Sequence, residues 1–494
     1  MPHSTPQPPS ASARPLRVAI IGAGPAGVYA ADILTKAERD FEVSIDLFEA
    51  YPAPYGLIRY GVAPDHPRIK GIVNALHKVL DRGDIRFLGN VTYGRDLTLS
   101  DFRAFYDAVI FSTGAIRDAD LDLPGIGLQG SFGAADFVSW YDGHPDVPRQ
   151  WPLEAREVAV IGNGNVALDV ARMLSKHADD LLVTEIPDNV YAGLKASPVT
   201  DVHIFGRRGP AQVKFTPLEL RELSHSKDVD IVLYPEDFEF DEASDEAIRT
   251  NNQTKTMVNT LTNWLVEEAS HSEHPASRRL HLHFLHSPVE ITGTDGHVSG
   301  IRFERMKLDG TGRAVGTGGI VEYPVQAVYR AIGYFGSELP EVGFDEDRGV
   351  IPNEGGRVLD VDGNPVPGIY TTGWIKRGPV GLIGSTKGDA LETIGCLLED
   401  RLSLPHAQHP GEHEIIELLE SRGVEYTTWA GWLKLDAHER ALGAAHAKAD
   451  AAADDVPDEA GTNDDGAASA AAGVSPRERI KVVPREEMVN ISRK

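Results

Sequence analysis

The sequence predicts an α/β protein with two domains of similar plan, each a mainly parallel β-sheet in a three-layer arrangement. Two segments, starting at Arg17 and Glu157, each combine a β-type run, a glycine-rich turn and a helix-compatible run. Each precedes a further β-rich run, an order typical of βαβ units in a parallel sheet. The chain has 494 residues, 41% of them hydrophobic, which is enough to build more than one packed core.

The N-terminal residues 1–14 are rich in Ser and Pro and lack the apolar centre of a secretory signal, so we expect a disordered tail. The most apolar stretch, residues 18–34, contains three glycines and Asp32. It falls short of the roughly 20 apolar residues that cross a bilayer. We therefore expect no integral membrane segment and a cytoplasmic protein.

The first glycine-rich turn follows the β-type run 17–21 and consists of Gly22, Ala23, Gly24, Pro25, Ala26 and Gly27. Gly22 permits a tight turn, Gly24 lets the backbone approach a pyrophosphate, and Gly27 allows the helix to pack closely on the strand. The start of the helix offers N–H groups to the phosphates. The next strand ends at Glu49, where a carboxylate can bind ribose hydroxyls. This combination predicts a Rossmann-like dinucleotide-binding domain.

The second turn consists of Gly162, Asn163, Gly164, Asn165 and Val166, followed by an alanine in place of the third glycine, a permitted variant. The next β-type run, residues 202–205, is followed by Arg207 and Arg208 instead of an acidic residue. Two guanidinium groups suit the 2′-phosphate of NADP(H), and the missing carboxylate removes the usual partner of an unphosphorylated ribose. The second domain is therefore predicted to bind NADP(H).

Two further β-type runs, residues 106–115 and 326–333, stand where the chain passes between the two modules. Their position predicts that the second module is inserted into the first. We expect residues 117–324 to form the inserted NADP-binding domain and residues 15–116 and 325–494 to form the other domain.

The C-terminal region changes composition abruptly. Residues 444–474 consist mostly of Ala, Asp and Gly and have too few large apolar groups to offset the entropy cost of ordering. We expect them to form a disordered acidic insertion. Residues 477–491 resume a foldable pattern, which we expect to pack back onto the body of the protein.

The charge balance and the cysteine content exclude several classes of function. Lys and Arg total 48 against 74 Asp and Glu, and the formal net charge of -26 opposes binding to nucleic acid or anionic membranes. The single cysteine, Cys396, excludes a disulfide framework and a metal or iron–sulfur site built from cysteines within the chain. We assign no metal ligands from the sequence and expect any redox centre to be a bound organic cofactor.

Five stretches beyond the first turn carry a resemblance to a known family: residues 51–70, 158–171, 203–222, 370–393 and 428–443. Together they resemble the FAD-dependent ferredoxin–NADP reductases of the adrenodoxin reductase type, from Arg17 almost to the end of the chain. The resemblance implies an FAD domain made from both ends of the chain with an NADP domain in the middle. It therefore implies FAD and NADP(H) as cofactors.

The resemblance also implies further cofactor-binding residues, namely Leu57, Val91, Gly114, Gly373, Trp374, Gly381, Leu382 and Ile383. Leu57 and Trp374 would pack beside the flavin, and Gly381 would lie near both the flavin and the nicotinamide. The glycine-rich turn before a helix-compatible run would aim N–H groups at the electron-rich edge of a reduced flavin ring. Arg117 is a weaker candidate for contact with the NADP phosphates.

His66 and Glu219 resemble the family's polar pair near the flavin and the nicotinamide. Such a pair could hold the ring, carry the proton that accompanies flavin reduction, or merely satisfy each other. Hydride transfer depends on alignment more than on acid–base assistance. We therefore predict a supporting catalytic role for both residues.

The predicted function is transfer of a hydride from NADPH to FAD and then of single electrons to a ferredoxin-like iron–sulfur protein. A flavin disulfide reductase shares the two-nucleotide plan, but the lone Cys396 excludes its usual cysteine pair. The sequence leaves open a flavin monooxygenase, an NADPH-dependent quinone or dye reductase, and a non-catalytic nucleotide-binding protein. An acidic ferredoxin would need local positive charge, for which Arg68, Lys70, Lys376 and Arg377 are candidates.

Overall fold

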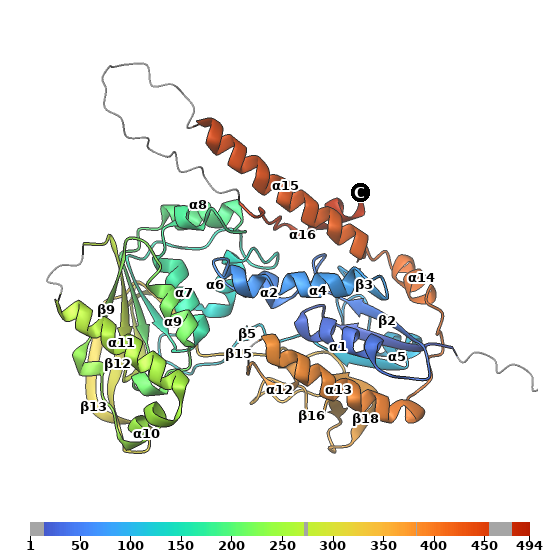
Figure 1. Ribbon diagram of the computed structural model, residues 1–494, viewed down its shortest axis with the longest axis horizontal. Helices are drawn as coiled ribbons and strands as arrows, with labels where there is room; N and C mark the ends of the chain where they lie inside the picture. Colours follow the sequence, from blue (N-terminus) through green and yellow to red (C-terminus); the bar gives the residue numbers. More distant parts are fainter. Residues whose placement is uncertain (1–13, 271–274, 382, 454–476) are drawn as a thin grey trace, which may run out of the picture.

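The computed structural model describes residues 14–270, 275–381, 383–453 and 477–494. Strands in these residues form sheets of eight, six, three and two strands. The two large sheets lie at the centres of two domains, which stand side by side in Figure 1. The predicted fold class, α/β with two domains built on large sheets, is confirmed.

The sheet of the first domain has the order β16-β17-β18-β4-β1-β2-β3-β19, and its five strands from β18 to β3 run parallel. Its strands are β1 (Leu16–Ile21), β2 (Val43–Phe48), β3 (Ile85–Gly89), β4 (Ala108–Phe111), β16 (Asn353–Glu354), β17 (Arg357–Leu359), β18 (Pro365–Thr371) and β19 (Thr427–Thr428). Successive residues of β1 point to opposite faces of the sheet. Val18 and Ile20 belong to the buried cluster on one face, and Ala19 and Ile21 belong to the cluster on the other.

Helices cover both faces of this sheet. The first face carries α1 (Pro25–Lys36), α4 (Val73–Leu80) and α13 (Thr386–Asp400), and the second carries α5 (Leu99–Phe105) and α14 (Glu414–Ser421). Helix α5 begins with a capping box, in which the side chains of Thr98 and Asp101 each accept a hydrogen bond from the backbone N–H of the other residue. The first domain therefore has the three layers that its sequence predicts.

The second sheet is parallel throughout the part of the chain that the structure describes, in the order β6-β14-β7-β8-β10-β9. Its strands are β6 (Ser131–Gly133), β7 (Glu157–Ile161), β8 (Asp201–Phe205), β9 (Val229–Leu233), β10 (Arg278–His283) and β14 (Ala327–Arg330). One face packs against α6 (Ala134–Tyr141), α7 (Asn165–Ser175), α9 (Pro217–Leu223) and α11 (Asn252–Ser270). The other face packs against an antiparallel sheet of β11 (His286–Thr294), β12 (His297–Leu308) and β13 (Ala314–Tyr323).

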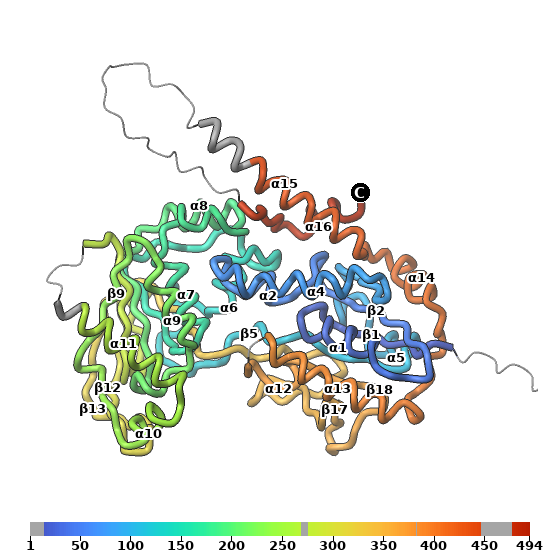
Figure 2. The backbone as a smooth tube through the Cα atoms, viewed as in Figure 1, coloured from blue at the N-terminus to red at the C-terminus, as the bar shows by residue number. Residues whose placement is uncertain are grey.

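The chain crosses between the domains twice, as its trace shows (Figure 2). It leaves through β5 (Arg117–Asp118) and returns through β15 (Tyr334–Phe335), and these two strands pair antiparallel. The predicted insertion is therefore present. The expected boundary between residues 324 and 325 lies too early, because β14 pairs with β6 and β7 of the second sheet. The sequence pattern predicts that β14 is a buried strand, but it does not show which sheet this strand joins.

Two expectations about disorder need correction. The backbone of α15 (Trp429–Ala453) is helical through residues 444–453, for which the composition predicts disorder. Alanine has the highest helix propensity, so this alanine-rich stretch continues the preceding helix. Residues 454–474 and 1–13 lie outside the described residues. Arg14, at the end of the expected tail, donates from both terminal nitrogens to Asp107 at 2.7 and 2.6 Å.

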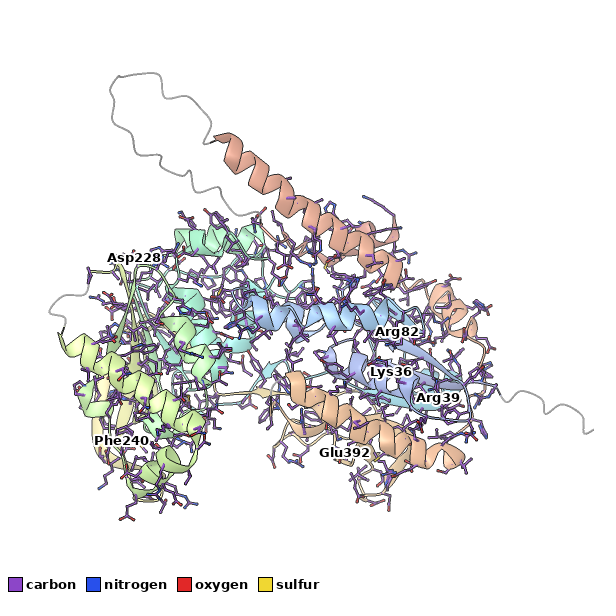
Figure 3. All side chains as sticks on the ribbon, viewed as in Figure 1. Lys36, Arg39, Arg82, Asp228, Phe240 and Glu392 are labelled. Carbon is purple, nitrogen blue, oxygen red and sulfur yellow. The ribbon has the colours of Figure 1, made fainter. Side chains whose placement is uncertain are left out.

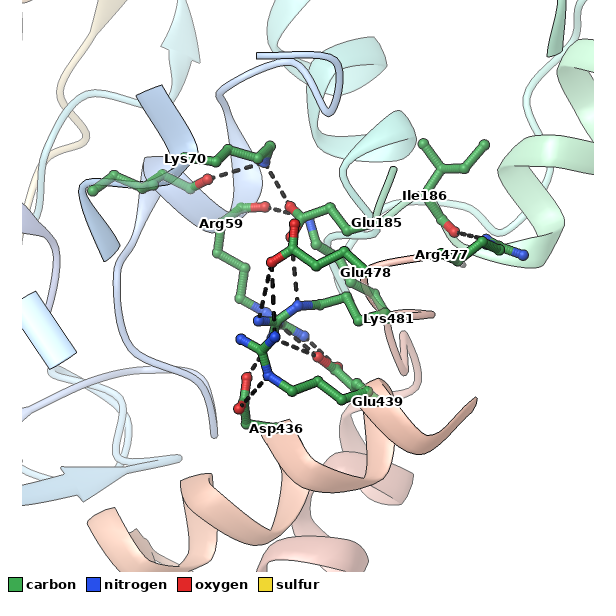
Figure 4. Close-up of polar contacts among 12 residues, drawn as sticks. Arg59, Lys70, Glu185, Ile186, Asp436, Glu439, Arg477, Glu478 and Lys481 are labelled. Carbon is green, nitrogen blue, oxygen red and sulfur yellow. Dashed lines mark hydrogen bonds and ion pairs between the residues drawn. The ribbon is translucent and has the colours of Figure 1, made fainter. Parts of the chain in front are cut away.

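The C-terminal residues pack back onto the body, where they join both domains. Lys481 Nζ lies 2.7 Å from Glu185 of the second domain and donates to the carbonyl of Arg59 of the first domain at 2.6 Å (Figure 4). Lys70 reaches the same Glu185 at 2.6 Å, and Arg59 forms a two-pronged ion pair with Glu439 of α15. All these side chains are buried, so the final segment closes a buried ionic network between the two domains.

The remaining helices are short. They are α2 (Leu57–Tyr60), α3 (Pro67–Lys70), α8 (Asp188–Ala196), α10 (Glu242–Thr250), α12 (Trp374–Arg377), α16 (Arg485–Arg493) and the 3₁₀ turns η1 (Ala178–Leu181), η2 (Pro210–Gln212), η3 (Pro235–Asp237), η4 (Ile383–Ser385) and η5 (Arg401–Ser403). Among the described helices, none combines the length and the apolar character needed to cross a membrane.

Candidate functional site

The first glycine-rich turn joins β1 to α1 in the way the sequence predicts. Gly22 has φ of +107°, and a Cβ on it would lie 2.5 Å from the carbonyl oxygen of Ser112, so only glycine fits there. Gly24 is the N-cap of α1 and Pro25 takes the first helical position, with no side chain capping the helix. A Cβ on Gly24 would meet its nearest atom only at 3.8 Å. The start of α1 is therefore open to a phosphate.

Glu49, at the end of β2, is tied to this turn. Its carboxylate accepts hydrogen bonds from the N–H groups of Ala23 at 2.9 Å and Tyr51 at 3.3 Å. Burial raises the pKa of Glu49 to about 7, against the opposing effect of these backbone hydrogen bonds. Its carbonyl accepts from the N–H of Val91 at 2.9 Å, which places Val91 beside it. The acid lies where a ribose next to the turn could reach it.

Two distant segments meet at the same turn. Tyr55, two residues before Leu57, donates its N–H to the carbonyl of Ala23 at 2.8 Å. A Cβ on Gly373 would lie 2.6 Å from the Cβ of Ala26, so the backbone before Trp374 passes directly over α1. The structure thus gathers the segments around Leu57 and Trp374, which lie more than 300 residues apart in the sequence, at the first nucleotide turn.

The second turn joins β7 to α7. Gly162 has φ of +147°, and a Cβ on it would lie 2.2 Å from the carbonyl oxygen of Ala331. A Cβ on Gly164 would meet no atom within 4 Å, which leaves the backbone open to a ligand. The neighbouring asparagines hold the loop before α9, since Asn163 O accepts from Lys214 N at 3.0 Å and Asn165 Oδ1 accepts from Thr216 N at 2.9 Å.

The two turns approach one another through a small apolar cluster between the domains. Ala115, Ala135 and Tyr334 are buried there, and Val166 of the second turn and Trp374 of the first domain pack against them. A fold in which the two turns faced apart would not allow this arrangement. The geometry agrees with two nucleotides whose reactive ends meet near Trp374.

The arginines that follow β8 lie at the edge of the second domain. Arg207 is exposed and Arg208 is partly buried. The backbone of this loop is fixed, because Leu285 N–H donates to the carbonyl of Arg208 at 3.3 Å. Within the described part of the chain, no ion pair or side-chain hydrogen bond occupies either guanidinium group. Both remain available to an anion such as a 2′-phosphate.

His66 and Glu219 come from different domains and meet. His66 is the N-cap of α3, and its Nε2 lies 2.9 Å from Glu219 Oε2 of α9 and 2.8 Å from Asp169 Oδ1 of α7. Arg172 Nη2 lies 2.7 Å from the same nitrogen, and its Nε donates to Asp65 at 2.8 Å. Asp65, Asp169 and Arg172 were not predicted from the sequence, although Asp169 and Arg172 stand at i and i+3 on the helix after the second turn.

The electrostatics of this cluster favour a protonated histidine. Burial lowers the pKa of His66, but the hydrogen bonds to Asp169 and Glu219 outweigh burial and raise this pKa to about 9. The cation of Arg172 acts in the opposite direction. His66 therefore holds a proton at Nε2 between two carboxylates at neutral pH.

The remaining predicted residues lie around the junction of the domains. Gly381 is exposed with φ of +86°, and Ile383 packs against the core of the first domain, whereas Leu382 lies outside the described residues. Gly114 precedes β5, and a Cβ on it would meet no atom within 4 Å. Arg117 lies exposed on β5, with its guanidinium carbon 5.8 Å from the ring centre of Phe335. Their contacts with cofactors stay predictions.

Two of the four candidate docking residues do not lie on the surface. Lys70 is buried with Glu185, and Lys376 is buried with Nζ 3.0 Å from Asp389 and 2.7 Å from Glu392, which Figure 3 labels on α13. Their acidic partners are remote in the sequence, so the pattern of basic residues alone gave no sign of these ion pairs. Arg68 is exposed and Arg377 is half-buried.

Comparisons with known proteins agree with this arrangement. Residues 16–202 match the family model described as pyridine nucleotide-disulphide oxidoreductase. The chain is 39% identical over 448 residues to the mitochondrial NADPH:adrenodoxin oxidoreductase of Arabidopsis thaliana, covering 88% of this chain and 92% of that protein. It is 40% identical over 450 residues to the NADPH-ferredoxin reductase FprA of Mycobacterium tuberculosis, covering 88% of this chain and 96% of that protein.

A solved structure gives the same result. Mycobacterium tuberculosis FprA in complex with NADPH matches with a TM-score of 0.83 and 36% sequence identity, over 97% of this chain and 100% of that chain. Sequence and fold therefore agree over nearly the whole length of the chain. The chain belongs to the family of FAD-dependent ferredoxin–NADP reductases of the adrenodoxin reductase type.

Proposed function

We propose that this protein is an NADPH–ferredoxin reductase, which takes a hydride from NADPH onto FAD and passes single electrons to a ferredoxin-like iron–sulfur protein. The names of its relatives support the NADPH and ferredoxin specificity. The observation that carries the proposal is the apolar cluster of Ala115, Ala135 and Tyr334, against which both Val166 of the second turn and Trp374 of the first domain pack. This shared cluster brings the two nucleotide sites to one junction, as direct hydride transfer requires.

The residues of both domains fit the two cofactors. The open backbone at Gly24, together with the buried carboxylate of Glu49, suits the pyrophosphate and ribose of FAD. The open backbone at Gly164 and the guanidinium groups of Arg207 and Arg208 suit NADPH. Bound FAD would supply the chemistry that accepts a hydride and releases electrons one at a time.

We assign the FAD domain to residues 15–116 and the segment after the β15 connector, and the NADP domain to the residues between the two connectors. In this assignment Leu57, Val91, Gly114, Trp374 and the segment 381–383 surround the flavin. Arg117, on the connector itself, lies between the two sites and is proposed to contact the NADP phosphates.

His66 and Glu219 are proposed to support the reaction from the domain interface. The proton at His66 Nε2 is shared with Glu219 and Asp169, so the cluster can hold or release a proton beside the reacting rings. The same contacts fix the distance between α3 of the first domain and α7 and α9 of the second. Both effects serve alignment, on which hydride transfer depends.

One experiment separates this function from the competing ones. The purified protein is examined for a flavin spectrum and titrated anaerobically with NADPH, with and without a bacterial ferredoxin. We expect NADPH to bleach the flavin and the ferredoxin to reoxidise it. An unbleached flavin would favour a non-catalytic nucleotide-binding protein. Reoxidation by quinone or oxygen, but not by ferredoxin, would favour a quinone reductase or a monooxygenase.

We also propose a cytoplasmic location. A chain with one cysteine builds no disulfide of its own, which is typical of proteins in a reducing compartment. Fractionation of the producing cells, with the protein followed by antibody, tests this proposal. Recovery in a secreted or organelle fraction would contradict it.

A further inference from the structure

Histidines gather on one face of the second sheet, far from His66. In β10, Leu280 and Leu282 join the core under the helices, so the alternating His281 and His283 point to the opposite face. His203 of β8 lies on that face too, as the register partner of His281. All three side chains are buried, and His203 and His283 contact Tyr323 of the sheet of β11 to β13, seen at the left of Figure 1.

The three imidazoles lie within reach of one ion. His203 Nδ1 and His283 Nε2 are 3.0 Å apart, and the rings of His203 and His281 stack with centres 4.1 Å apart. One ring nitrogen of each histidine lies within 4.8 Å of one in both others. Four-coordinate zinc separates its ligand nitrogens by about 3.3 Å, since each Zn–N bond is about 2.0–2.1 Å long. The three nitrogens are therefore close enough to reach one centre once the side chains rotate.

The rings also carry lone pairs. Two facing nitrogens 3.0 Å apart, on His203 and His283, share one hydrogen at most, so one of them is an acceptor. Nε2 of His281 lies 3.0 Å from Asp201 Oδ1, which is an acceptor for its hydrogen, so in the neutral ring the lone pair is on Nδ1, 2.9 Å from the hydroxyl of Tyr234. Neutral imidazole is the form that binds metals.

The surroundings of His281 match those of a metal ligand. A carboxylate that accepts from the distal ring nitrogen orients the ligating nitrogen and raises its basicity, and Asp201 is placed to do this. Asp201 is itself held by two hydrogen bonds from Arg279, at 2.6 and 2.9 Å. The side chains of His281 and Asp201 are each 10% exposed, so an ion could enter from the solvent at this edge of the sheet.

We propose that His203, His281 and His283 form a binding site for a divalent transition metal ion of the zinc class, with water in the fourth position. The stacked rings cannot all direct a nitrogen at one point, so at least one imidazole turns out of the stack when the ion binds. The site lies on the sheet face opposite α7 and does not depend on the proposed function.

A second group of His, Asp and Glu in the described residues also brings its ligand atoms within 4.8 Å of one another, namely His66, Asp169 and Glu219. Arg172 places a cation 2.7 Å from His66 Nε2, which opposes a metal ion there. In the part of the chain that the structure describes, no Lys or Arg nitrogen forms a hydrogen bond with His203, His281 or His283. The test therefore has to separate the two groups.

The test begins with the FAD-loaded, full-length protein after treatment with a chelator. Zn²⁺ is titrated by calorimetry, and Co²⁺ by its visible ligand-field absorption, which is strong in four-coordinate sites. We expect one equivalent of either ion to bind. Absence of saturable binding, or a Co²⁺ spectrum typical of six oxygen ligands, would overturn the proposal.

Variants then locate the ion. His203→Phe and His281→Phe keep a ring in the stack and should weaken Zn²⁺ binding at least about tenfold. His297→Phe, at an exposed position on β12, and His66→Gln should bind as the wild type does. Binding that survives both ring variants, or that disappears in His66→Gln, contradicts the proposal. Should neither ring variant bind FAD, X-ray absorption of the wild-type zinc complex decides between three imidazole ligands and a carboxylate-dominated set.

Discussion

His66 of the first domain and Glu219 of the second lie 2.9 Å apart, Nε2 to Oε2, and both side chains are buried. Neither domain alone contains this pair. Its geometry therefore reports on how the two nucleotide-binding domains sit against each other, and a change at either residue acts on their alignment. The rate of flavin reduction and the pH dependence of stability should both respond to this contact.

We expect His66→Gln to retain FAD but to slow the reduction of the flavin by NADPH about tenfold to 100-fold, because small errors in alignment have effects of this size on hydride transfer. Stopped-flow measurement of flavin bleaching checks the rate. Glu222→Gln, on the same helix as Glu219 but paired with His225, is the matched control. Bleaching at the wild-type rate would show that His66 packs in the domain interface without supporting flavin reduction.

The stability of the protein should depend on pH through the same residue. The folded pKa of His66 is about 9 and the ordinary value is 6.5, so its stabilising contribution is complete below about pH 6.5 and disappears as the pH rises through about 9. Urea unfolding of the wild type and His66→Gln should show a difference that shrinks by up to about 3 kcal/mol over this interval. A difference that is constant with pH would contradict the assigned protonation.

The coenzyme preference should depend on Arg207 and Arg208. Replacing either by Ala removes a charge-assisted hydrogen bond worth roughly 1.5–3 kcal/mol, so kcat/KM for NADPH should fall about tenfold to 100-fold. The value for NADH should change little. Arg313→Ala, at an exposed turn of the same domain, is the control. Equal use of NADPH and NADH by the wild type would refute the assignment.

Gly164→Ala should separate folding from nucleotide binding. A Cβ there meets no protein atom within 4 Å, so thermal stability and FAD content should match the wild type. The methyl group would occupy the space that the pyrophosphate needs, and KM for NADPH should rise at least about tenfold. Gly127→Ala, at another open and exposed glycine, should leave both properties unchanged. An unchanged KM in Gly164→Ala would remove this turn from the binding site.

The buried network at the C-terminal segment should contribute strongly to stability. Glu185→Gln removes the nearer of the two carboxylates that Lys70 and Lys481 share and leaves them only Asp142, and loss of one partner in a buried ion pair costs about 3–5 kcal/mol. Glu478→Gln, at a half-exposed side chain, should cost less than about 1 kcal/mol. Denaturant unfolding measures both. Equal costs would show that the network is not a major source of stability.

The sequence predicted the features that local backbone chemistry dictates. The two turns could be predicted because Gly22 and Gly162 occupy positions that exclude a Cβ, and because the acid and the arginines stand just after the next strand of each sheet. The meeting of the segments around Leu57 and Trp374 was available only from the family resemblance.

Other features depend on partners remote in the sequence. The burial of Lys70 and Lys376 and the sheet that receives β14 follow from tertiary contacts that leave no local pattern. The alternation of leucine and histidine in β10 was visible, but its partner His203 stands 80 positions away from His283. Residue types gave the chemistry of these groups, and only the fold shows which of them meet.

The buried ionic network has a consequence for biosynthesis. Its anions Glu185, Asp142 and Glu439 precede residue 440, whereas Arg479 and Lys481 follow them in the chain and leave the ribosome later. A nascent chain that has not yet reached residue 479 holds these carboxylates with Arg59 and Lys70 alone. The buried network between the two domains can therefore be completed only after residues 479–481 have been synthesised.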